Sequence, residues 1–257
     1  MEKNFFEWVM FFFQSNWQQF LLGTATTLLV SLSGTIIGFF LGLGVSLIQY
    51  TKTDDKSSTL FKGFIKFLKI LISIYITIFR GTPMIVQAMV IFYGLPQLIG
   101  LNLDPLPAAL LIVSINTGAY MAEMIRGGVD SVDPGQLEGA QAIGMSHFQA
   151  MISIIFPQAV RNVLPSIGNE FIINIKDTSV LNVIGVTELF FTSKSIAGSY
   201  AKYYEVFIIT SVIYLFLTFT ISLILKSIEK KIDGPKNFEI LPLQDGNNVV
   251  IKKGKGV

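Results

Sequence analysis

Ionisable and amide side chains lie inside an otherwise apolar stretch, from about Val163 to Leu189. A charge within a membrane span costs about 2.5–3.5 kcal/mol even on insertion scales, so such side chains would have to face protein or water. A zwitterionic ligand needs cationic donors for its carboxylate and anionic or carbonyl acceptors for its ammonium group. The stretch supplies both kinds through Asn169, Glu170, Asn174, Lys176, Asp177, Thr178 and Ser179.

Two interpretations of this polar cluster stay open. It lines a pathway for a polar solute, or it forms an internal ion-pair network that holds a broken helix together with Arg80. Lys176 and Asp177 are adjacent and do not face each other on a regular helix, so they serve different partners or mark an unwound turn. Asn116 is a further pathway candidate, although a hydrogen bond between helices explains it equally well.

The composition is typical of a chain embedded in lipid. Of the 257 residues 51% are apolar and only 14% charged, where soluble domains have about 25% charged residues. The charge-free gaps from Glu7 to Lys52 and from Glu205 to Lys226 suit spans of about 20 residues. We therefore expect an all-α integral membrane protein. The net charge of +2 argues against nucleic acid as a partner, and the absence of cysteine excludes disulfides and thiolate metal sites.

Five spans are predicted, at about 20–48, 84–98, 106–123, 163–189 and 206–225. The second follows a break at Arg80-Gly81-Thr82-Pro83, because proline lacks an amide donor and disfavours helix in the residue before it. A shallow helix is expected up to Phe79. The first span carries a ridge of small residues that should meet a neighbouring helix, formed by Gly34, Gly38, Gly42 and Gly44.

The lysines predict the orientation of the chain. They cluster after the first and fifth spans, which places those ends in the cytoplasm and the N-terminus outside. Residues 1–19 are expected to form an external or interfacial helix, 20–226 the membrane domain and 227–257 a flexible cytoplasmic tail. Glu123 and Arg126 stand at helical spacing near the end of the third span and are interpreted as an ordinary surface pair without a transport role.

Two helix starts follow one another in the cytoplasmic loop 133–157. Asp133 is a helix N-cap followed by proline, with Gln136 at the capping-box position. Gly144 is expected to end this first helix, Ser146 with Gln149 repeats the capping box, and Pro157 is expected to end the second helix. The helix–bend–helix element is either a rigid knob that another protein grips or an interfacial connector.

The residues of this loop resemble the EAA loop of ABC importer permeases. Glu138-Gly139-Ala140, Gly144 and Phe156-Pro157 stand at the family's spacing, with Gly139 for the usual alanine and Phe156 for the usual leucine. Three further motifs are similar to the polar amino-acid branch of that family: Phe79 to Pro83, Asn169-Glu170-Phe171 and Lys176-Asp177-Thr178-Ser179.

The resemblance implies a type I ABC importer fold, a five-span bundle with a cytoplasmic coupling loop. It implies the permease subunit of a transporter that takes up a polar amino acid across the bacterial cytoplasmic membrane. The implied partners are two ATPase subunits, a second permease copy or a paralogue, an extracellular amino-acid-binding protein and membrane lipid. The ATPase contact would involve the loop residues Glu138, Gly139, Ala140, Gly144, His147 and Pro157.

The chain itself is not expected to be an enzyme. It has no G-x-x-x-x-G-K-[ST] phosphate loop, so ATP and Mg would be bound by the partner ATPase, and no cofactor or metal is expected here. Three alternatives are weaker. An ion-coupled secondary transporter would have inverted repeats and more spans. An intramembrane enzyme would need a nucleophile with a base or a set of metal ligands, and a chain with one histidine and no cysteine is poor in both. A passive scaffold would leave the buried charges unexplained.

Overall fold

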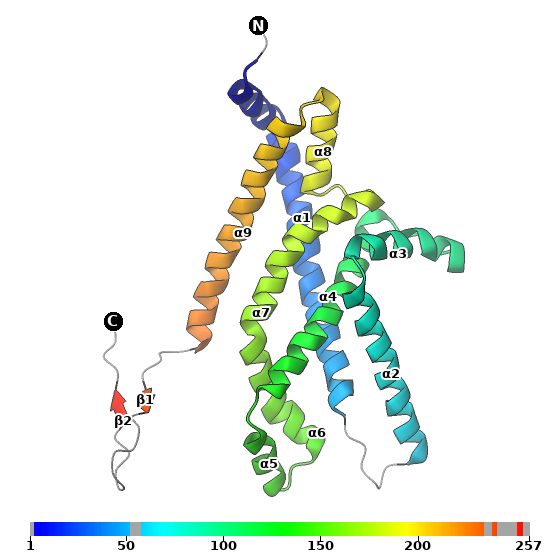
Figure 1. Ribbon diagram of the computed structural model, residues 1–257, viewed down its shortest axis with the longest axis vertical. Coiled ribbons are helices and arrows are strands. Elements are labelled where there is room, and N and C mark those ends of the chain that lie inside the picture. Colours follow the sequence, from blue (N-terminus) through cyan, green and yellow to red (C-terminus); the bar gives the residue numbers. More distant parts are fainter. Residues whose placement is uncertain (1–2, 52–57, 234–237, 241–250, 254–257) are drawn as a thin grey trace.

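The computed structural model describes residues 3–51, 58–233, 238–240 and 251–253, and nearly all of this part is helical (Figure 1). Four helices are long and apolar enough to cross a membrane: Phe5–Tyr50, Pro105–Asp130, His147–Ile184 and Tyr203–Lys231. A fifth apolar helix, Met84–Ile99, is shorter. The predicted all-α membrane fold is therefore confirmed. In the tail, β1 (Phe238–Ile240) pairs antiparallel with β2 (Ile251–Lys253), and the rest of the predicted tail after Asp233 lies outside the described residues.

Helix α1 (Phe5–Tyr50) contains the predicted external helix and the first span in one element. Asn4 begins it with a capping box to Glu7. Its 46 residues extend over about 69 Å, more than a bilayer needs. No glycine or proline occurs before Gly23, so nothing in the chain ends the helix near residue 19. Figure 1 shows the N-terminal turns bent away from the rest of α1.

Among the described helices, α1 and α4 (Pro105–Asp130) pack together most extensively, and the glycine ridge lies at their contact. A Cβ atom on Gly34, Gly38 or Gly42 would lie 2.4, 2.8 or 2.6 Å from side-chain atoms of α4, closer than atoms can approach. The predicted ridge is thus confirmed at three positions. Gly44 is not part of it, because a Cβ there would meet no atom within 4 Å.

The predicted break between α2 (Thr59–Gly81) and α3 (Met84–Ile99) is present, with Pro83 as the N-cap of α3. The orientation of the two helices differs from the expectation. In Figure 1 α2 runs alongside α4, and its Ile72 and Ile76 pack against Ala122, whereas α3 lies crosswise to α2 and extends outward from the bundle. The helix expected to be shallow is therefore the one aligned with the spans.

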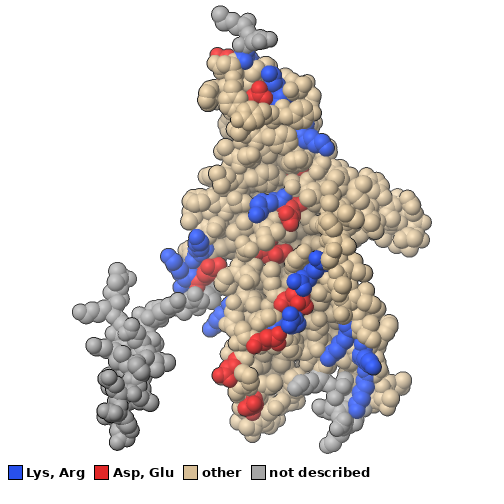
Figure 2. Space-filling view, viewed as in Figure 1, with Lys and Arg blue, Asp and Glu red and all other residues tan. Residues whose placement is uncertain are grey.

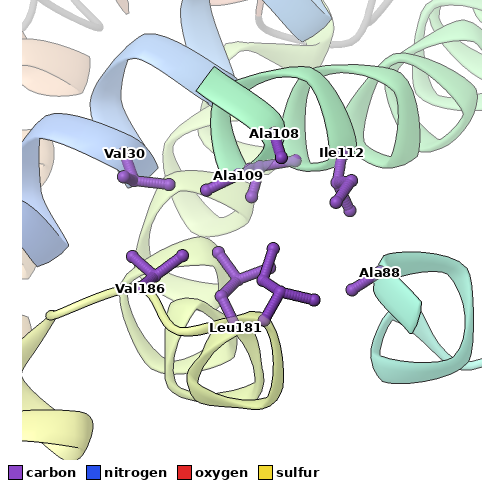
Figure 3. Packing of buried hydrophobic residues seen from close by; sticks show 9 residues of the cluster. Val30, Ala88, Ala108, Ala109, Ile112, Leu181 and Val186 are labelled. Atoms are coloured by element: carbon purple, nitrogen blue, oxygen red, sulfur yellow. The ribbon is translucent and has the colours of Figure 1, made fainter. Parts of the chain in front are cut away.

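One cluster of buried apolar residues joins four segments of the chain. Figure 3 shows Val30 of α1, Ala109 and Ile112 of α4 and Ala88 of α3 around Leu181. Leu181 belongs to η2 (Thr178–Ile184), a 3-10 helix that continues α7 (Phe156–Asp177). Since residues so distant in sequence share one cluster, the end of α7 is fixed by packing as well as by its own hydrogen bonds.

The predicted fourth span, 163–189, ends earlier than expected. Gly185 takes a left-handed conformation with φ 83° and ends η2, and a separate helix α8 (Leu189–Tyr200) follows. Helix α9 (Tyr203–Asp233) then returns along α7 and α1. Lys176 and Asp177 are the last residues of α7, and the change to a 3-10 helix begins directly after them, at Thr178.

Candidate functional site

Two helix starts separated by a bend lie between α4 and α7, as predicted. Asp133 caps α5 (Pro134–Ala142) by accepting a hydrogen bond of 2.7 Å from the amide of Gly135. Gly144 has φ 86° at the bend, and Ser146 and Gln149 form a complete capping box at the start of α6 (His147–Ala150). The capping-box hydrogen bond expected between the side chain of Gln136 and the amide of Asp133 does not occur among the described residues. The bend is therefore a defined structure.

The predicted ATPase-contact residues divide into an outer and an inner group. Glu138, Gly139 and Gly144 are exposed, whereas Ala140 is only 3% exposed and anchors α5. His147 is half-buried, and its Nε2 lies 3.0 Å from the backbone oxygen of Tyr50, at the end of α1. The outer surface of α5 is thus free to bind another protein, while His147 connects α6 to α1.

Pro157 does not end the second helix, contrary to the prediction. The chain continues helically from His147 through η1 (Met151–Ile155), a π-helical turn, into α7, and Pro157 lies in the first turn of α7. A π turn widens the backbone before the proline, which accommodates its missing amide hydrogen without a break. The coupling loop is therefore continuous with the helix that carries the charged residues.

Asn174 connects three helices rather than standing at a free surface. It is 2% exposed, and its amide nitrogen donates to the hydroxyl oxygens of Thr35 in α1 (2.9 Å) and Thr117 in α4 (3.0 Å). Buried polar groups paired in this way fix the register of neighbouring helices. A structural role explains Asn174 in this conformation, and its predicted place in the pathway stays a prediction.

Asn116 lies in α4, and its side chain binds residues at the α2–α3 break. Its amide nitrogen donates to Gln87 (2.9 Å) and to the carbonyl of Phe79 (3.3 Å). Gln87 in turn donates at 2.9 Å to the carbonyls of Phe79 and Thr82. These amides bind carbonyl groups that the end of α2 leaves without helical partners. The interhelical hydrogen bond considered for Asn116 is therefore present, and Gln87 is a residue that the sequence analysis missed.

Replacing Gln87 by leucine is expected to lower the free energy of unfolding by about 2 kcal/mol, because two partly buried carbonyls at the break lose their donor. Thermal unfolding of the purified chain in detergent measures the change. The control is Gln97→Leu, since Gln97 lies in the same helix but is exposed. Equal unfolding temperatures for the two variants would contradict this role for Gln87.

Arg80 has a different partner from the one considered in the sequence. Its Nη1 lies 3.3 Å from Glu123, and among the described residues neither Glu170 nor Asp177 forms an ion pair with it. Glu123 also binds Arg126 at 3.0 Å, and Arg126 binds Asp130 at 3.0 Å. The Glu123–Arg126 pair is therefore part of a longer arrangement, which we call the charged row: Arg80, Glu123, Arg126 and Asp130.

The other charged candidates lie on α7. Glu170 is 5% exposed, and no hydrogen bond or ion pair to it occurs among the described residues. Lys176, Asp177 and Asn169 are exposed. The internal ion-pair network is thus not formed among the described residues in this conformation. Asn169, Lys176 and Asp177 are available to water, to a solute or to another subunit, whereas Glu170 is buried.

The end of α7 opens into a hollow between α7, α8 and α9. Its volume is about 440 Å³, and its walls include Lys176, Ser179 and Tyr214. Thr178, the first residue of η2, is buried, and its hydroxyl donates to the carbonyl of Ile175 at 2.9 Å. Within the described part of the chain, no group of three or more histidine, aspartate or glutamate residues is arranged to hold a metal ion.

The exposed surface separates into polar and apolar faces. Figure 2 shows positive and negative side chains alternating in a diagonal row over α4, while the surface over α3 is uncharged. Exposed side chains of α7 include Asn162, Ser166, Asn169 and Lys176, at helical spacing. The middle of α9 instead exposes mainly large apolar side chains, among them Val212, Leu215, Phe216 and Phe219. The apolar faces suit lipid, and the polar face of α4 and α7 does not.

Glu188 is a second residue that the sequence analysis missed. It is fully buried and caps α8 by accepting hydrogen bonds from the amides of Phe190 (2.8 Å) and Phe191 (2.6 Å). The hydroxyl of Tyr214 in α9 donates to it at 3.1 Å. Gly185 before an apolar run was the available signal, because glycine commonly ends one helix shortly before another starts.

Comparison with known proteins gives consistent matches. Residues 60–234 match the family described as binding-protein-dependent transport system inner membrane component. The chain is 35% identical over 210 residues to the arginine transport system permease protein ArtQ of Bacillus subtilis, covering 82% of this chain and 90% of that protein. It is 37% identical over 210 residues to the glutamine transport system permease protein GlnP of Escherichia coli, covering 81% and 90%.

Solved structures show the same likeness. A chain from a crystal structure of an amino acid ABC transporter with histidines aligns with a TM-score of 0.76 and 35% identity, over 90% of this chain and 100% of that one. A chain of the inward-facing MetNI methionine ABC transporter aligns with a TM-score of 0.67 over 84% of this chain and 96% of that one. At 17% identity the second match shows a shared fold alone.

Proposed function

The chain belongs to the family of binding-protein-dependent transport system inner membrane components and is the permease subunit of an amino-acid ABC importer, and from this premise we propose how its surfaces work. The loop 133–157 binds the ATPase subunits, and the polar face of α4 and α7 lines the pathway for a polar amino acid. Family membership decides against the secondary transporter and the scaffold.

The exposed outer surface of α5 carries the ATPase proposal. Glu138 and Gly139 are exposed on α5 while Ala140 of the same helix is buried, so a partner can bind them without disturbing the core. Ile143 and Phe148 flank the bend and are 79% and 61% exposed. Exposed apolar side chains at a rigid, capped bend are typical of a protein interface. ATP and Mg would be bound by the ATPase.

The polar face supports a second permease copy or a paralogue as a partner. Charged and amide side chains on α4 and α7 cannot face lipid at acceptable cost, so they face water or another subunit. Two permeases that meet through these faces enclose a polar path between them. Asn169, Glu170, Lys176, Asp177 and Ser179 would then be close to the passing solute.

The substrate is proposed to be a polar amino acid delivered by an external binding protein. Relatives named for arginine and glutamine transport support this class. The mixture of a lysine with two carboxylates on one helix suits the opposite charges of an amino acid. The protein is proposed to be a multi-pass protein of the bacterial cytoplasmic membrane. Lysines at the start of α2 and at the end of α9 favour a cytoplasmic C-terminus and an external N-terminus.

The test is retention of an ATPase on the tagged chain purified in mild detergent. The unaltered chain should retain the ATPase, and Glu138→Arg should lose most of it, because the charge is reversed at the centre of the proposed contact. The control is Glu229→Arg, the same change near the end of α9. If Glu138→Arg retains as much ATPase as the control, α5 is not the binding surface. If the unaltered chain retains none, the loop does not bind an ATPase.

A further inference from the structure

The charged row connects the two surfaces of the proposed function. At one end Arg80 lies beside the α2–α3 break and binds Glu123. At the other end Asp130 accepts a hydrogen bond of 2.7 Å from the hydroxyl of Tyr50. The backbone oxygen of Tyr50 lies 3.0 Å from Nε2 of His147, the first residue of α6. A continuous series of polar contacts therefore runs from the helix break to the coupling loop.

Helix α4 provides a rigid middle for this series. Glu123, Arg126 and Asp130 follow one another at intervals of three and four residues, so they lie on one face over about 10 Å of helix. Arg126 binds both carboxylates at 3.0 Å. A displacement at either end therefore changes the partners of the next charge.

Stability alone does not account for the charged row. Its side chains are 42%, 22%, 48% and 54% exposed in the order Arg80, Glu123, Arg126 and Asp130. Ion pairs this exposed contribute little to stability, while charges on a membrane helix are costly to insert. A need to hold α2 and α4 in a defined relative position explains better why four charges occur together on this face.

We propose that Tyr50, Glu123, Arg126 and Asp130 are positioning residues that transmit movement of the coupling loop to Arg80 and the α2–α3 break. This inference rests on the proposed binding of an ATPase to the loop. Movement of α5 and α6 would displace Tyr50 through His147. The charged row would then shift the end of α2 and, with it, the direction of α3.

The experiment measures movement at the break directly. The chain has no cysteine, so Val86→Cys places a single thiol in the first turn of α3, at a residue that is 48% exposed. The permease–ATPase complex is purified, and the rate at which a maleimide labels this cysteine is compared with and without ATP. Retention of the ATPase and its hydrolysis rate are recorded on the same samples.

Two changes interrupt the charged row in the Val86→Cys background. Tyr50→Phe removes one oxygen and keeps the ring that packs against Phe156 at 6.3 Å. Glu123→Gln removes the central charge. The matched control is Tyr75→Phe, because the Tyr75 hydroxyl also donates to α4, at 2.6 Å to Ile115, but lies outside the row.

We expect ATP to change the labelling rate in the background and in the control. Each interrupting change should reduce that ATP-dependent difference by roughly threefold to thirtyfold, the range of measured coupling effects. The double variant should lose no more than the worse single variant, since both interrupt one series.

Three results would overturn the inference: no ATP-dependent change in the background, an undiminished change in both interrupting variants, or an equal loss in Tyr75→Phe. These results differ from failure of the proposed function, which is the absence of a retained ATPase.

Discussion

Substitution of Gly42 by valine is expected to prevent the native packing of α1 on α4 and to lower the free energy of unfolding by about 3 kcal/mol or more. Even a single Cβ at this position would lie 2.6 Å from the Cβ of Met121 and 2.7 Å from the backbone nitrogen of Ala122. Backbone atoms of a packed helix cannot move aside as a flexible side chain can, so the two helices must separate. Heating of the purified chain in detergent, followed by gel filtration, measures the loss.

Gly44→Val is the matched control for this prediction. Gly44 lies half a turn away on the same helix, and a Cβ there would meet no atom within 4 Å. Both variants have the same helix propensity and the same added volume, so only contact with α4 distinguishes them. Equal stability of the two variants would show that α1 and α4 do not pack as described.

Features of the sequence that depend on local chemistry were predicted well. Proline at residue 83, the capping box of Ser146 and Gln149 and the left-handed Gly144 each act on the backbone within four residues. Such effects depend on residues that are close together in the sequence, so they can be predicted without the tertiary structure. The two helix starts of the coupling loop and the bend between them were therefore found from the sequence alone.

Contacts between distant residues were not predictable in the same way. The partner of Arg80 is 43 positions away, at Glu123, and Asn174 binds Thr35, which is 139 positions away. Which charged residues meet depends on the rotation of each helix about its axis, and periodicity alone does not determine that rotation. The charges of α7 could therefore be recognised as functional candidates and the local Glu123–Arg126 pair of α4 could be predicted, but the link from Arg80 to Glu123 could not.

Pro157 shows a third situation, in which a local rule has two structural solutions. A proline in a helical stretch either ends the helix or is accommodated by a wider turn. The buried side chains of Met151, Ile155 and Phe156 pack in one cluster with Ile125 and Val163, which favours the continuous path. Tertiary packing therefore selected the π turn, and the sequence pattern did not contain that information.

Replacement of Glu188 by alanine is expected to be the second most damaging change, with a loss of about 3 kcal/mol in the free energy of unfolding. The variant removes the N-cap of α8, worth about 1 kcal/mol, and leaves the hydroxyl of Tyr214 buried without its acceptor, which costs about 1–3 kcal/mol. Helix α8 would detach at its first turn, where α1 also binds it through Thr27 and the amide of Leu189. Thermal unfolding in detergent measures the change.

Three further variants separate the contributions at Glu188. Ser58→Ala removes a comparable but exposed N-cap from α2 and should cost about 0.5–1 kcal/mol. Tyr214→Phe removes the buried hydroxyl together with its need for an acceptor, so its loss should be smaller than that of Glu188→Ala. In the double variant the orphaned hydroxyl no longer exists, and Glu188→Ala should then cost less than it does alone. Strictly additive losses would mean that Glu188 and Tyr214 do not stabilise α8 and α9 as a pair.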